Sequence, residues 1–161
     1  MQDAAPTPFR TKTQTVLPDW IDYNGHMNVA YYTLAFDRAL DDLYEAMDIG
    51  PSAVKTRAQG PMALQTQIHY LAELLEGEAF YCDALLVDCD HKRVHCMLTM
   101  IAESDGRLVA TYETLSINVD LTARRSAPYP SETAVALERL CQAQAALARP
   151  VQMGRIIGIR R

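Results

Sequence analysis

The sequence predicts an α+β domain in which one long helix lies across a curved antiparallel sheet of about five strands. Three observations predict this class. Apolar residues recur at helical spacing over about twenty residues after Asn28, and four later segments alternate apolar with polar residues as strands do. Strands and helices do not alternate along the chain, which argues against a parallel sheet.

The first half of the chain supplies one strand and the long helix. Residues 9–17 are rich in β-branched residues and end at Pro18, which predicts a strand closed by a turn. The helix begins after Asn28 and ends at Gly50-Pro51, before a loop that contains Gly60-Pro61. Its apolar stripe consists of Val29, Tyr32, Phe36, Leu40, Leu43 and Met47.

The second half supplies the rest of the sheet. Strands are expected at 62–70, 78–88, 92–104 and 108–120, and the last three form an antiparallel meander joined at Asp90-His91 and Asp105-Gly106. A helix is expected over 131–147, with Ser131 as its N-cap, and a tail follows it. The length of the chain predicts that residues 1–161 form a single domain. Because one helix covers one face and leaves the sheet edges open, we expect a homodimer or a dimer of dimers.

Composition excludes several classes of protein. The net charge of -5 argues against a protein that coats nucleic acid. No apolar run approaches the roughly 20 residues of a membrane span, and the start Met-Gln-Asp-Ala-Ala-Pro lacks the features of an export signal. We therefore expect no membrane association and a cytoplasmic location. The four cysteines form no C-x-x-C pair, which predicts reduced thiols and no metal site; they are Cys82, Cys89, Cys96 and Cys141.

The segment from Trp20 to Asn28 brings chemical groups to the start of the long helix. There, unpaired backbone amides and the positive end of the helix dipole attract a developing negative charge. Asp22 could attack a carbonyl or activate water, Gly25 lets the backbone approach closely, and His26 or Asn24 could orient either partner. The alternative is structural, with Asp22 or Asn24 capping the helix, His26 as a polar residue with its hydrogen bonds satisfied, and Gly25 making a turn.

The order Asp-x-x-Gly-His-x-Asn, long helix, antiparallel sheet resembles the hotdog-fold thioesterases of the 4-hydroxybenzoyl-CoA thioesterase type over nearly the whole chain. Residues 19–26, 68–73, 90–95 and 153–157 are similar to the branch that includes betainyl-CoA thioesterases of carnitine breakdown. The resemblance implies that Asp22 is the catalytic carboxylate and that the backbone near Gly25 polarises the thioester carbonyl. Other branches place the carboxylate on the central helix, which makes Asp37 the fallback.

Candidate substrate contacts come from aromatic residues and a histidine. Four aromatic residues lie close to the predicted site in sequence and could hold a quaternary ammonium acyl group, namely Trp20, Tyr23, Tyr31 and Tyr32. Tyr32 also matches the buried stripe of the helix, and aromatic residues beside a helix start often serve as core. His69 and Glu73 are four residues apart and would face the same side of a strand. His69 is a candidate to face the site across a dimer, or else a polar residue on a half-exposed sheet face.

Basic residues in turns are candidates for binding the phosphates of coenzyme A. These are Arg93, Arg124 and Arg125, for which ordinary solvation is the alternative. No cofactor or metal is expected, because the coenzyme A thioester is itself the substrate. The sequence thus predicts an acyl-CoA thioesterase that acts on a small acyl group. A hotdog-type dehydratase or hydratase of 3-hydroxyacyl thioesters and a non-catalytic acyl-CoA-binding regulator are the alternatives.

Overall fold

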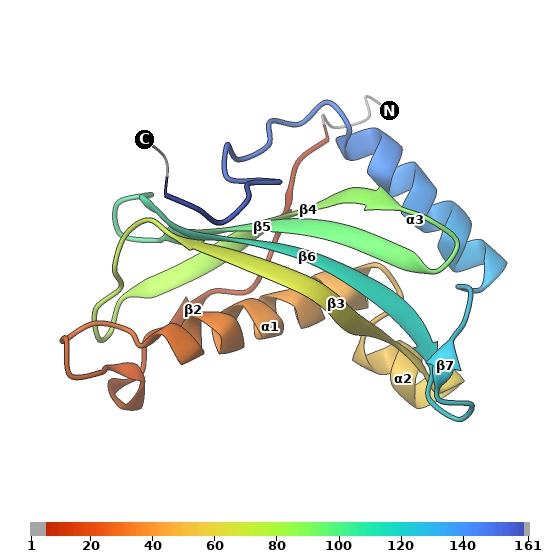
Figure 1. The fold of residues 1–161 in the computed structure, drawn as a ribbon, viewed down its shortest axis with the longest axis horizontal. Helices are drawn as coiled ribbons and strands as arrows, with labels where there is room; N and C mark the ends of the chain where they lie inside the picture. Colours follow the sequence, from red (N-terminus) through yellow and green to blue (C-terminus); the bar gives the residue numbers. More distant parts are fainter. Residues whose placement is uncertain (1–5, 160–161) are drawn as a thin grey trace.

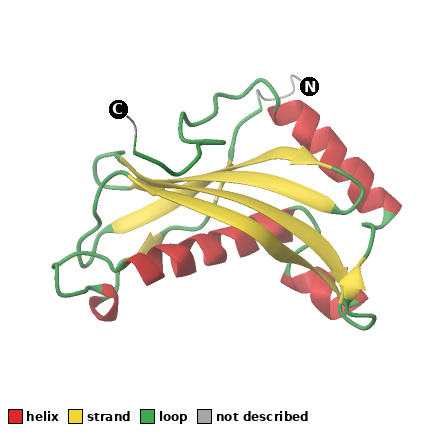
Figure 2. Cartoon of the chain, viewed as in Figure 1, coloured by secondary structure: helices red, strands yellow, loops and turns green. Residues whose placement is uncertain are grey.

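The computed structural model describes residues 6–159 as one antiparallel sheet with three α-helices (Figures 1 and 2). A short 3-10 turn, η1 (Pro18–Trp20), precedes the first helix. The helices are α1 (Val29–Ala46), α2 (Pro51–Arg57) and α3 (Ser131–Gln144). The strands are β1 (Phe9–Arg10), β2 (Gln14–Thr15), β3 (Gln59–Tyr70), β4 (Ala79–Cys89), β5 (Arg93–Ala102), β6 (Leu108–Asp120) and β7 (Arg125–Ser126).

The sheet has the order β1-β4-β5-β6-β3, with β2 also on β4 and β7 on β6. All pairings are antiparallel, so the predicted meander of β4, β5 and β6 is confirmed. Its second turn places Gly106 at φ +71°, a left-handed conformation that glycine adopts without strain. Figure 1 shows α1 lying along the concave side of the curved sheet, while α3 lies near β4.

The predicted apolar stripe of α1 packs against the inner face of the sheet. Tyr32, Phe36, Leu40, Leu43 and Met47 are all buried, and the Phe36 ring stacks on Tyr112 of β6 with a centroid distance of 5.0 Å. Val29, the first residue of the stripe, is the exception at 56% exposed. Val29 is the first residue of the helix and lines the groove described below.

The predicted first strand is not continuous. It forms two short pieces, β1 and β2, both of which pair with β4. Between them the backbone amide and ammonium group of Lys12 both bind the Asp42 carboxylate of α1, at 3.0 and 2.8 Å. The register with β4 shifts by one residue between the pairs Arg10–Asp83 and Gln14–Phe80, and the contact of Lys12 with α1 lies at this shift.

Helix α2 was missing from the sequence prediction, which placed a loop after Gly50-Pro51. Pro51 occupies the first turn of α2, and Lys55 and Arg57 lie in its last turn, positions that suit a short helix. Gly50 is required by a close approach, because an added Cβ would lie 2.5 Å from the backbone nitrogen of Glu45. The predicted C-terminal helix is confirmed as α3, although Pro130 precedes it as N-cap and Ser131 is its first helical residue.

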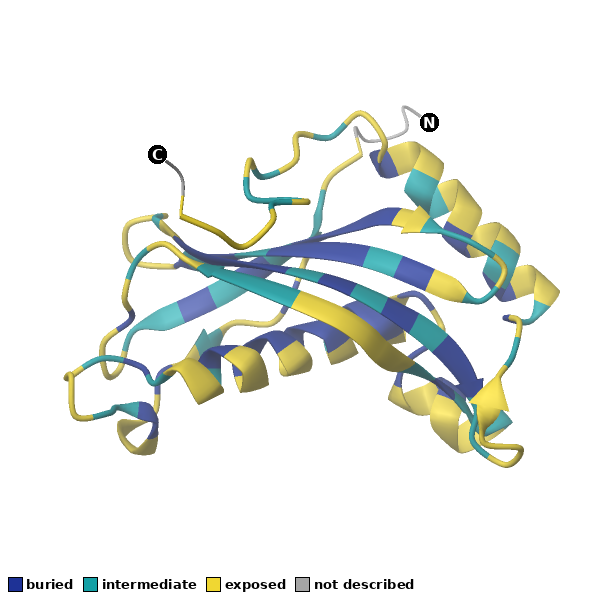
Figure 3. Ribbon diagram, viewed as in Figure 1, coloured by how far each residue is buried: buried dark blue, intermediate teal, exposed yellow. Residues whose placement is uncertain are grey.

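The two edges of the sheet differ. Strands β1 and β2 occupy the outer side of β4, whereas β3 has no neighbour beyond it within the described residues. Residues 62–66 of β3 are all exposed, including Met62 at 41% and Leu64 at 55% (Figure 3). None of the helices in residues 6–159 is long and apolar enough to cross a membrane.

Candidate active site

The predicted catalytic segment forms a tight turn immediately before α1. The Asp22 amide donates to the His26 carbonyl at 3.1 Å, and the Gly25 amide donates to the Asp22 carbonyl at 2.9 Å. Gly25 has φ +81°, and an added Cβ there would meet no atom within 4 Å. Glycine is therefore needed for the backbone conformation, and the space in front of it is open.

The Asp22 carboxylate is held by two donors. One oxygen accepts from the Asn24 amide at 2.8 Å, and the other accepts from the Asn28 side-chain amide at 3.2 Å. The carbonyl oxygen of the Asn28 side chain accepts from the Ala30 amide at 2.9 Å, so Asn28 is the N-cap of α1. Of the structural alternative, the capping of the helix by Asp22 or Asn24 is wrong, whereas Gly25 does form a turn.

Asn28 is a site residue that the sequence prediction did not assign. It couples two tasks, since one end of its amide caps α1 and the other end positions Asp22. The signal was present as an asparagine at the start of the apolar periodicity, where capping residues concentrate.

Substitution of Asn28 separates these two tasks. Asn28→Ser retains a capping oxygen but is too short to reach Asp22, whereas Asn28→Ala loses both contacts. We expect both variants to lower kcat about tenfold, as the loss of one orienting hydrogen bond predicts. Only Asn28→Ala should lower the free energy of unfolding, by about 1 kcal/mol. Steady-state kinetics and denaturant unfolding check this, and a serine variant with wild-type kcat would contradict the positioning role.

Backbone amides for an oxyanion are available next to Gly25 rather than on it. The Gly25 amide is already engaged within the turn, and those of Met27 and Asn28 donate to the carbonyls of Leu74 and Trp20. In the described part of the chain, the amides of His26 and Val29 have no acceptor. These two donors, at the positive end of α1, are placed to stabilise negative charge on a carbonyl oxygen.

His26 lines a groove beside the turn. Its Nδ1 lies 3.1 Å from the Met27 carbonyl oxygen and must donate to it, so Nε2 of the neutral ring is left as an acceptor. The groove has a volume of about 370 Å³. Its walls are His26, Met27, Val29, Tyr32, Tyr70, Leu71, Ala72 and Glu73.

The far wall of the groove is the segment that follows β3, and it is tied to α1. The Tyr32 hydroxyl accepts from the Leu74 amide at 3.2 Å, and the Met27 amide donates to the Leu74 carbonyl at 2.8 Å. Burial raises the pKa of Tyr32, which keeps its hydroxyl protonated. The catalytic turn and the post-β3 segment therefore form one connected unit.

Of the aromatic residues predicted around the site, Tyr32 lines this groove, whereas Trp20, Tyr23 and Tyr31 do not. Trp20 is 4% exposed and stacks on Tyr31 with a centroid distance of 5.3 Å, and the Arg38 guanidinium lies 5.5 Å from the Trp20 ring. Tyr23 is 96% exposed at the tip of the turn. The second aromatic residue that lines the groove is Tyr70, which the sequence analysis did not assign to the site.

His69 and Glu73 were predicted to face the same side of a strand, and the structure does not support this. Strand β3 ends at Tyr70, so Glu73 lies in the following segment, where it lines the groove. Tyr70 packs edge-to-face on Tyr32, and alternation places its neighbour His69 on the opposite face of β3. Within one protomer His69 is directed away from the groove.

The predicted phosphate-binding arginines lie at the opposite end of the molecule from the catalytic turn. Strand β7, which contains Arg125, lies near the end of α1, whereas the turn precedes its beginning (Figure 1). Arg124 and Arg125 are exposed and have no ion pair within the described residues. Arg93 pairs with the Asp90 carboxylate at 2.6 Å and is therefore less available for phosphate.

The fallback carboxylate, Asp37, is also remote from the turn. It lies nine residues beyond Asn28, roughly 13 Å along the helix. Asp37 lines a separate groove of about 440 Å³ between α1, α2 and β3, together with Asp41 and Tyr44. Burial raises the pKa of Asp41, and the Asp37 charge adds to that shift.

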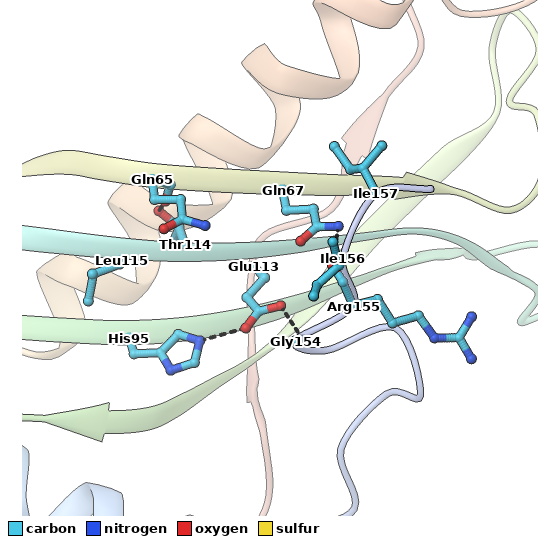
Figure 4. Close-up of a pocket in the computed structure, with 10 residues that line it drawn as sticks. All are labelled: Gln65, Gln67, His95, Glu113, Thr114, Leu115, Gly154, Arg155, Ile156 and Ile157. Carbon is cyan, nitrogen blue, oxygen red and sulfur yellow. Dashed lines mark hydrogen bonds and ion pairs between the residues drawn. The ribbon is translucent and has the colours of Figure 1, made fainter. Parts of the chain in front are cut away.

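A further cavity, of about 540 Å³, lies on the outer face of the sheet beneath the C-terminal tail (Figure 4). There His95 of β5 lies 2.9 Å from the Glu113 carboxylate of β6, whose other oxygen accepts from the Gly154 amide at 2.7 Å. The Gln67 side chain of β3 also donates to the Arg155 carbonyl. These bonds fix the tail on the sheet, and the cavity contains none of the predicted catalytic residues.

Comparison with protein families places residues 16–137 in the thioesterase-like superfamily. A betainyl-CoA thioesterase of Pseudomonas aeruginosa is 32% identical over 144 residues, which cover 89% of this chain and 91% of that protein. An L-carnitine dehydrogenase/betainyl-CoA thioesterase of Rhizobium meliloti is 30% identical over 154 residues, 96% of this chain but 31% of that protein.

Solved structures agree with these sequence relatives. A hypothetical protein of Staphylococcus aureus, determined in complex with CoA, superimposes with a TM-score of 0.86 at 28% identity, covering 98% of this chain and 100% of that one. A putative thioesterase of Pseudomonas putida gives a TM-score of 0.82 at 28% identity, covering 96% and 98%. The predicted hotdog fold is confirmed.

Proposed function

The chain belongs to the thioesterase-like superfamily and is an acyl-CoA thioesterase, and we propose that it removes a small acyl group, with betainyl-CoA as the first candidate substrate. The observation that carries the catalytic part is the Asp22 carboxylate, fixed by Asn24 and Asn28 beside the unoccupied amides of His26 and Val29. The substrate is suggested by the betainyl-CoA thioesterases among the relatives.

The proposed reaction begins when the thioester carbonyl enters the site at the start of α1. Asp22 either accepts a proton from the attacking water or adds to the carbonyl carbon itself and forms an anhydride that water then cleaves. In both routes the carbonyl oxygen becomes an oxyanion that the amides of His26 and Val29 stabilise. When the oxyanion collapses, the C–S bond breaks and the thiolate of coenzyme A leaves and takes up a proton. This step gives the free acid directly when water attacks, and it gives the anhydride when Asp22 attacks, from which water then releases the acid and restores the Asp22 carboxylate. No cofactor or metal is needed beyond the thioester.

We also propose that the active unit is a homodimer, which could assemble further as a dimer of dimers. The support is the unpaired edge of β3, where Met62 and Leu64 are exposed and backbone N–H and C=O groups are available for pairing with another strand. Pairing two copies through this edge would also allow residues remote from the turn in one protomer to approach the partner's site. Arg124 and Arg125 would bind coenzyme A phosphate in that arrangement, and the protein would function in the cytoplasm.

A thiol-release screen tests the proposed reaction. Betainyl-CoA, a set of short-chain acyl-CoAs and aromatic acyl-CoAs are compared by kcat/KM, with coenzyme A detected by a thiol-reactive dye. We expect small acyl groups to be hydrolysed and betainyl-CoA to be preferred. A crotonyl thioester that is hydrated faster than any thioester is hydrolysed would support the dehydratase alternative instead, and inert substrates that still bind would support a regulator.

A further inference from the structure

The groove beside the catalytic turn has a shape suited to a compact, rounded group. Tyr32 and Tyr70 meet edge-to-face, with ring centroids 5.3 Å apart and planes at 84°. Two perpendicular rings form a corner rather than a flat wall. Tyr32 is buried, whereas Tyr70 is 48% exposed and is therefore accessible to a ligand in the groove. Apolar atoms of Met27, Val29 and Leu71 complete the walls and suit methyl groups.

The charge of the groove favours a cation. Glu73 is the one acidic residue that lines it, and no lysine or arginine lines it. Arg107 approaches the segment but donates to the Glu73 backbone carbonyl at 3.1 Å, while its guanidinium binds the Glu78 carboxylate at 2.7 Å and Asp105 at 3.0 Å. Within residues 6–159, no cationic group lies within 4.0 Å of the Glu73 carboxylate.

The groove also adjoins the position proposed for the reacting carbonyl. His26 and Val29, whose amides are free, both line it. In a betainyl thioester a single methylene separates the quaternary nitrogen from the carbonyl carbon, so the site for the cation must lie directly beside the site for the carbonyl. The post-β3 segment is firmly held for this task, because the amides of Leu71 and Ala72 both donate to the Val109 carbonyl.

We propose that this groove binds the quaternary ammonium end of the acyl group, with the Tyr70 ring and the Glu73 carboxylate as the residues that recognise its charge. The inference rests on the proposed function and adds the residues that determine its specificity. An aromatic face attracts a desolvated ammonium through its quadrupole, and a nearby uncompensated carboxylate adds a Coulombic attraction. The recognition unit therefore comes from the end of β3 and not from the aromatic residues around Trp20.

The test compares two thioesters of the same shape and different charge. Betainyl-CoA carries a trimethylammonium group, and 3,3-dimethylbutanoyl-CoA carries a neutral tert-butyl group in the same place. We expect the wild type to favour the cationic ester by tenfold or more in kcat/KM. Glu73→Gln and Tyr70→Leu should each reduce kcat/KM for betainyl-CoA about tenfold and change the neutral ester less than about twofold.

Matched variants control for loss of fold and for general charge. Glu76→Gln removes an exposed carboxylate of the same segment that does not line the groove, and it should leave both substrates unaffected. Tyr70→Phe keeps the aromatic ring and should retain the preference for the cation. Thermal unfolding of each variant identifies any that misfolds, and the ratio of the two substrates is independent of the amount of active enzyme.

The outcomes separate this inference from the function on which it rests. If the wild type hydrolyses neither ester nor any other acyl-CoA, the proposed function fails. If it hydrolyses both esters with equal kcat/KM, or if Glu73→Gln and Tyr70→Leu leave the ratio of the two unchanged, the thioesterase stands and the cation site is wrong. A selective loss on betainyl-CoA supports it.

Discussion

Replacing Asp22 with asparagine should lower kcat for thioester hydrolysis by about a thousandfold, the scale on which a general base or nucleophile contributes. Asparagine has nearly the same shape and can still accept the Asn24 amide that now binds the carboxylate at 2.8 Å. It can neither take a proton from water at neutral pH nor attack a carbonyl. Asp22→Ala should be equally inactive, because the loss is chemical rather than steric.

Asp19→Asn is the matched control for this measurement. Asp19 lies three residues earlier in η1 and its side chain makes no hydrogen bond within the described residues, so its loss should leave kcat within about twofold. Substrate affinity should survive in Asp22→Asn, which equilibrium binding of a non-hydrolysable thioether analogue would measure. A variant at Asp22 with kcat near the wild-type value would show that Asp22 is not the catalytic carboxylate, and Asp37 or a residue of a second copy would be tested next.

The long elements were predictable because each contains enough residues to repeat its own period. The stripe of α1 passes through five turns, and each of the strands β3 to β6 is ten residues long or more. The short elements follow tertiary contacts instead. The break between β1 and β2 lies at the contact of Lys12 with Asp42, thirty residues away, and no local pattern in residues 9–17 contains that information.

The candidate site was predictable where it is local and not where it is assembled. Asp22, Gly25 and His26 belong to one turn, so their spacing in the sequence reflects their spacing in space. The groove that they border draws its other wall from Tyr70 and Glu73, about fifty residues later. Trp20 and Tyr31 are closer in sequence but lie on another flank of α1, where they stack on each other. Proximity in sequence was therefore a poor guide to the substrate contacts.

Substitution of Leu64 by lysine should convert the proposed dimer to a monomer, with at least a hundredfold increase in the dissociation constant. Leu64 lies in the middle of the exposed stretch of β3 and at the point where the register with β6 shifts. Two copies that join along this whole exposed stretch about a two-fold axis place the axis near the centre of the stretch. Leu64 of one protomer then lies close to Leu64 of the other. Lysine there would place two like charges in contact and remove apolar area from both sides.

Sedimentation velocity over a range of concentrations measures the dimer, and Val135→Lys is the matched control. Val135 is 48% exposed on α3, comparable to Leu64 at 55%, but it lies away from β3 and should leave the dimer intact. Arg124 and Arg125 lie remote from the turn of their own protomer, so the proposed binding of coenzyme A by these residues requires the partner's site. Monomeric Leu64→Lys should therefore show a raised KM for acyl-CoA, whereas a monomer with an unchanged KM would remove both arginines from the binding site.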